Sequence, residues 1–165
     1  MHVAICLFTI FSTWRWGDWQ NWRKYHATMF YIAAGGLLYE YLTKDYTLWI
    51  FHPDFLYNQQ MTVIVYAFVT MPLSVLLFLS RFPQTLKKQL IYLTKWLLIY
   101  TIAEIILQYF GRISYQNGWS LFHSFLFDIM MFPMLVFHHK RPLLAYLVSF
   151  VIVVLLMHWF DVPMS

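Results

Sequence analysis

Three carboxylates stand inside otherwise apolar segments of the chain, and they are the residues best suited to chemistry. They are Glu40, Glu104 and Asp128. A charge near the centre of a membrane helix costs about 2.5–3.5 kcal/mol even on a mild insertion scale, so such groups usually face the interior of a helical bundle. There a carboxylate can hold a proton, bind a cation or form hydrogen bonds between helices.

Helical spacing places further polar side chains beside these carboxylates. Tyr100, Glu104 and Gln108 recur at every fourth position and predict one polar stripe. Ser124 lies one turn before Asp128 and predicts a local hydrogen bond to it. Depth and orientation together predict a polar pocket in the outer half of a bundle, able to hold a ligand, an ion or a proton. Its expected residues are Glu40, Glu104, Gln108, Arg112, His123, Asp128 and His158.

Two interpretations of these residues stay open: a binding pocket, or polar groups that only define how the helices pack. A third alternative uses the region of Glu104 and His123 as acid and base in a lipid-modifying enzyme. No metal site, cofactor or catalytic residue is predicted, because the sequence has no HExxH, CxxC, EF-hand, GxSxG or glycine-rich phosphate motif. The single cysteine, Cys6, excludes an internal disulfide.

The elements that must position these residues are membrane helices. Of the 165 residues, 61% are hydrophobic and only 11% are charged, far below the charged fraction of a soluble domain. We expect one all-α integral membrane domain over residues 1–165, a polytopic bundle of about six spans. The expected segments are Met1–Trp14, Tyr25–Thr43, Met61–Ser80, Gln89–Phe110, Gly118–Phe137 and Pro142–Phe160.

The first segment is the shortest. At about 21 Å it crosses a hydrocarbon core of about 30 Å only with help from the tryptophans that follow it. If it lies at the interface instead, five spans remain. The tryptophan-rich loop from Trp14 to Trp22 is interpreted as an aromatic belt, and the loop from Lys44 to Gln60 is expected to lie across the bundle as a cap.

Basic residues set the orientation, because Lys and Arg in short loops stay on the cytoplasmic side. The loops after segments one, three and five carry eight of them, whereas those after segments two and four carry only Lys44 and Arg112. The C-terminus is therefore expected outside. The same rule accounts for the net charge of +4, since the basic residues lie between apolar segments, and no nucleic-acid partner is predicted.

Several stretches resemble a family of small multi-pass membrane proteins from spore-forming bacteria related to Bacillus and Clostridium. They are GDWQNWRKYHATMF (17–30), the pair Leu48 and Trp49, IAEIILQYFGRISYQNGWS (102–120) and HHKRPLLAY (138–146). YQNGW and the KRP turn are the most specific. The family is uncharacterised, so the resemblance implies a bacterial plasma membrane and no functional residues.

The leading functional hypothesis is a non-enzymatic membrane component that binds lipid or a membrane protein, which includes a second copy of the chain. The main alternative is a small transporter or ligand-binding protein that uses the outer polar pocket.

Overall fold

The computed structural model, which describes residues 1–56 and 58–163, is mostly helical. Its elements in chain order are α1 (His2–Trp16), the 3₁₀ helix η1 (Trp19–Lys24), α2 (His26–Leu42), β1 (Trp49–Phe51), α3 (Gln59–Val65), the π-turn η2 (Tyr66–Thr70), α4 (Met71–Ser80), α5 (Leu86–Tyr109), β2 (Ile113–Tyr115), α6 (Leu121–Lys140) and α7 (Pro142–Trp159). Each predicted apolar segment contains a helix, and α3, η2 and α4 form one continuous run.

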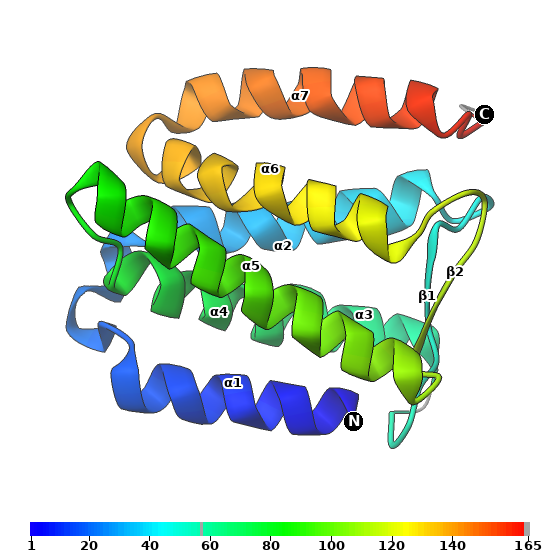
Figure 1. The fold of residues 1–165 in the computed structure, drawn as a ribbon, viewed down its shortest axis with the longest axis horizontal. Coiled ribbons are helices and arrows are strands. Elements are labelled where there is room, and N and C mark those ends of the chain that lie inside the picture. Colours follow the sequence, from blue (N-terminus) through cyan, green and yellow to red (C-terminus); the bar gives the residue numbers. More distant parts are fainter. Residues whose placement is uncertain (57, 164–165) are drawn as a thin grey trace.

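The helices run back and forth along one direction (Figure 1). β1 and β2 lie together at one end, called here the sheet end, with the start of α1 and the end of α7. The loops after α1, α4 and α6 lie at the opposite end, called here the basic end because they carry Lys and Arg. α1 and α7 lie at opposite edges of the bundle.

Four helical stretches are long and apolar enough to cross a bilayer: Gln59–Ser80, Leu86–Tyr109, Leu121–Lys140 and Pro142–Trp159. The first is the centre of the bundle, with 56% of its most apolar window buried, and it packs against both α1 and α2. The second and fourth stretches are peripheral, since only 6% and 11% of the residues in their most apolar windows are buried. α1 and α2 have 15 and 17 residues, so at about 1.5 Å per residue they are shorter than a hydrocarbon core of about 30 Å.

A π-turn interrupts the central helix just before Pro72, where the Met71 backbone N–H bonds back to the Tyr66 carbonyl. Proline has no N–H to donate and crowds the preceding turn, which accounts for the interruption of the helix at this position. The Thr13 hydroxyl donates to the nearby Leu73 carbonyl at 3.1 Å. One buried side chain of α1 thereby fixes that helix to the interrupted stretch.

The core divides into two clusters. The larger one surrounds α4 and α6 toward the basic end. At its centre, the buried ring of Phe78 packs against the rings of Tyr92, Trp96 and Phe132. The smaller one lies at the sheet end and contains Leu48, Trp119, Met157, Phe160 and Val162.

The antiparallel strand pair closes the sheet end. Its register places Trp49 opposite Tyr115 and Phe51 opposite Ile113. β1 belongs to the loop that was expected to cap the bundle, but the partner strand comes from the next loop on the same side. The cap is thus built from two loops, each of which supplies hydrogen bonds that a three-residue strand cannot satisfy alone.

Candidate functional site

The Glu104 carboxylate is bound by both loops of the cap. One of its oxygens, Oε1, accepts hydrogen bonds from Trp49 Nε1 at 3.0 Å and from Tyr115 Oη at 2.8 Å. These donors come from facing positions of β1 and β2. Glu104 therefore ties the sheet-end half of α5 to both strands, and both donors point at a single acceptor atom.

Asp128 lies on the adjacent helix, α6, and is only 6% exposed. Its carboxyl group is close enough to Glu104 for the two charges to interact. Among the described residues, no side chain donates a hydrogen bond to it. The expected bond from Ser124 to Asp128 is absent, and the Ser124 hydroxyl instead accepts from Trp119 Nε1 at 2.9 Å. The result is two neighbouring carboxylates: Glu104 is half-buried and accepts two bonds at one oxygen, whereas Asp128 is buried and accepts none from a described side chain.

Aromatic rings cluster around Trp49, one of the two donors to Glu104. The Trp49 ring centroid lies 5.3 Å from that of Trp119, 5.8 Å from that of Tyr39 and 6.2 Å from that of Phe127. Such a cluster of rings limits the access of water to the hydrogen bonds of Glu104. The surroundings suit either a buried hydrogen-bonded joint or a site that holds a proton or small cation.

Burial raises the pKa of the Tyr115 phenol, and its hydrogen bond to the Glu104 carboxylate raises the pKa further. The phenol therefore stays protonated at physiological pH and remains a hydrogen-bond donor. The hydrogen bond from Tyr115 to Glu104 is therefore not lost through ionisation of the phenol at physiological pH.

The other predicted pocket residues lie apart from the acidic pair. Glu40 is half-buried near the end of α2, Gln108 is exposed at the end of α5, and His158 is exposed near the end of α7. His123 Nδ1 is 2.9 Å from Ser120 Oγ and its ring packs against Trp119 and Phe160. The structure thus brings together Glu104 and Asp128, with His123 in the neighbouring cluster, and leaves the other four outside.

Arg112 follows the end of α5 and is half-buried. Its Nη1 donates to the Pro53 carbonyl across a long 3.4 Å, and its Nε is buried without a partner among the described residues. It forms no ion pair within the described part of the chain.

A second polar joint was not predicted from the sequence. His2 is fully buried: its backbone N–H donates to Asp54 at 2.9 Å, Nδ1 lies 3.1 Å from Tyr66 Oη, and Nε2 lies 3.1 Å from the His52 carbonyl oxygen. The sequence signal for it is an ionisable residue at the start of an apolar segment. This joint fastens the start of α1 to the cap and to the central helix.

No group of three or more His, Cys, Asp or Glu side chains in the described residues could hold a metal ion. Glu104 and Asp128 offer two carboxylate groups. No protein-family model, curated protein or solved structure matches this chain. Its interpretation therefore depends on the geometry above.

Proposed function

We propose that the chain crosses a bacterial plasma membrane six times, with the sheet end outside. The distribution of charge supports this orientation, because the eight basic loop residues gather at the basic end. Exposed aromatic side chains also ring both ends, as expected at two membrane interfaces. They are Trp14, Trp16, Trp19 and Trp22 at the basic end, and Tyr41, Phe55, Tyr109, Phe110 and Trp159 at the sheet end.

The belts extend the reach of α1, which is otherwise short for a crossing. Lys95 lies inside α5 with an exposed side chain. Its long stem allows the ammonium group to reach toward the basic end. The buried contacts of His2 and Thr13 hold α1 against the central helix, which favours a crossing over an interfacial position.

Cysteine labelling tests this topology in intact cells. In a Cys6→Ser background, Asp45→Cys at the sheet end is expected to react with a membrane-impermeant maleimide. Gln84→Cys, equally exposed at the basic end, is expected to react only after permeabilisation. The reverse pattern would invert the orientation. A tag added before Met1 distinguishes the two span counts: external protease removes it from a six-span protein and not from a five-span one.

We further propose that the protein acts by binding a membrane lipid or a membrane protein, without catalysis. The observation that supports this function is the hydrogen bonding of Glu104, a carboxylate of the predicted pocket. Both of its hydrogen-bond partners come from the protein's own cap, so its role is to fix the shape of the sheet end. The large apolar faces of α5 and α7 remain available to lipid or to a partner helix.

Native mass spectrometry after extraction in a mild detergent tests this function. We expect a retained phospholipid or a second polypeptide at fixed stoichiometry. A bare monomer from several mild detergents, together with no crosslinked partner in cells, would contradict the proposal.

A second candidate function is cation- or proton-dependent ligand binding at Glu104 and Asp128. The burial of Asp128 beside another carboxylate, without a hydrogen-bond donor from the described side chains, favours it. The Asp128 variant described in the Discussion separates the two functions.

A further inference from the structure

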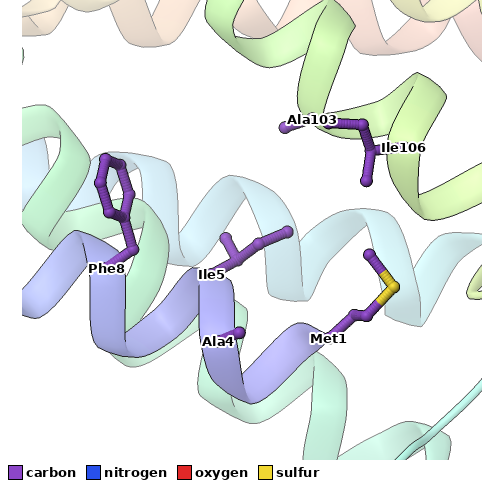
Figure 2. A pocket seen from close by; sticks show the side chains of 6 residues that line it. All are labelled: Met1, Ala4, Ile5, Phe8, Ala103 and Ile106. Atoms are coloured by element: carbon purple, nitrogen blue, oxygen red, sulfur yellow. The ribbon is translucent and has the colours of Figure 1, made fainter.

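An apolar groove lies between α1 and α5 on the outside of the bundle. α1 packs on η2 and α4, whereas α5 packs on α6, so the two helices leave a gap that other elements do not fill. Figure 2 shows the side chains on either side of it. The groove has a volume of about 250 Å³ and is lined by Met1, Ala4, Ile5, Phe8, Ala103 and Ile106.

The size and lining of the groove limit what can occupy it. Its volume is below the range of about 300–1,000 Å³ that is usual for compact small-molecule sites, and a helix of about 10 Å diameter does not fit. Two alanines, Ala4 and Ala103, leave room where larger side chains would close it. A single flexible hydrocarbon chain matches this shape, and its lining offers no polar side chain that would oppose one.

Hydrogen bonds connect the sheet-end mouth of the groove to the residue Arg112. Met1 lines the groove, and the next residue, His2, bonds to the His52 carbonyl. The His52 backbone N–H in turn donates to the Arg112 carbonyl at 2.9 Å. The Asp54 carboxylate is occupied by the nitrogen atoms of Met1 and His2. The Arg112 guanidinium has no anionic partner among the described residues and makes one long bond, to the Pro53 carbonyl.

From this arrangement we propose that the α1–α5 groove binds one acyl chain of an anionic phospholipid, whose phosphate pairs with Arg112. The inference rests on the proposed membrane function and names its ligand. Arginine matches a phosphate through two parallel hydrogen bonds, and the apolar lining holds the chain below it. The lipid would fill the space between the two helices and complete the packing of α1.

Binding of two purified lipids tests the proposal. The purified protein in mild detergent is titrated with dioleoyl phosphatidylglycerol and with dioleoyl phosphatidylcholine, and adducts are counted by native mass spectrometry. The wild type is expected to retain the anionic lipid about tenfold more strongly, a factor that corresponds to about 1.4 kcal/mol. Arg112→Gln is expected to remove that preference, Arg112→Lys to keep part of it, and Lys44→Gln, which alters an exposed cation at the same end, to leave it unchanged.

A second pair of variants tests the groove itself. Ala103→Trp fills it and is expected to lower retention of both lipids about tenfold, whereas Ile102→Trp, on the adjacent exposed face of α5, leaves retention unchanged. Equal retention by Ala103→Trp and Ile102→Trp would overturn the groove and leave the broader lipid-binding function standing. Absence of any lipid adduct or protein partner in the wild type would overturn both.

Discussion

Replacing Glu104 by alanine is expected to loosen the sheet end and to lower the free energy of unfolding by about 2–4 kcal/mol. The reason is the loss of one acceptor that serves two donors, Trp49 Nε1 and Tyr115 Oη. Each buried donor left without a partner costs about 1–3 kcal/mol. Thermal unfolding in detergent measures the loss, and faster hydrogen exchange of the β1 and β2 amides locates it at the cap.

Two control variants make this result specific. Glu104→Gln keeps a carbonyl acceptor of similar shape and is expected to lose about 1 kcal/mol or less. Glu40→Ala removes a half-buried carboxylate that has no hydrogen-bond partner among the described residues, so its effect should stay within about 0.5 kcal/mol. If Glu104→Ala unfolds at the same temperature as Glu40→Ala, Glu104 does not hold the cap.

The substitution Asp128→Asn is expected to act in the opposite direction and to stabilise the protein by on the order of 1 kcal/mol. Asp128 is buried beside Glu104 and receives no hydrogen bond from a described side chain. A neutral amide of nearly the same size is cheaper to bury than a carboxylate and removes the interaction between two like charges. Thermal unfolding at neutral pH is expected to give a higher melting temperature for Asp128→Asn than for the wild type.

Titration with salts separates this result from the second candidate function. If Glu104 and Asp128 bind a cation, the wild type should be stabilised by sodium or potassium chloride and not by a chloride salt of a large organic cation, and Asp128→Asn should abolish the difference. A melting temperature of Asp128→Asn below that of the wild type in every salt would contradict the expected gain. It would show that the carboxylate is needed for folding.

The positions of the helices could be predicted from the sequence because continuous apolar runs leave few alternatives in a chain this poor in charge. The ends of the helices were predicted less accurately. α5 begins at Leu86, before Lys87 and Lys88, and α6 continues to Lys140 beyond its apolar run. Polar residues can prolong a helix outside the hydrocarbon layer, so hydropathy marks the apolar part of a helix and misses its polar turns.

The strand pair could not be predicted, since its two strands have only three residues each and come from different loops. The acidic residues of the site were identified, but Trp49 and Tyr115 lie in those loops and their role depends on the pairing. Gln108 was placed wrongly for a geometric reason. Eight residues at about 100° each leave it roughly 80° away from Tyr100 around the helix, on the exposed face.

The strand pair also sets an order of events during biosynthesis. Fifty-five positions separate Trp49 from Glu104, and the central helix and most of α5 lie between them in the chain. In the proposed topology, the hydrogen bond from the Trp49 indole to Glu104 can form only after this helical hairpin has entered the bilayer. Closure of the cap then reports correct insertion of the hairpin. A chain in which α5 stays outside leaves both loops open at the cell surface, where proteases can remove it.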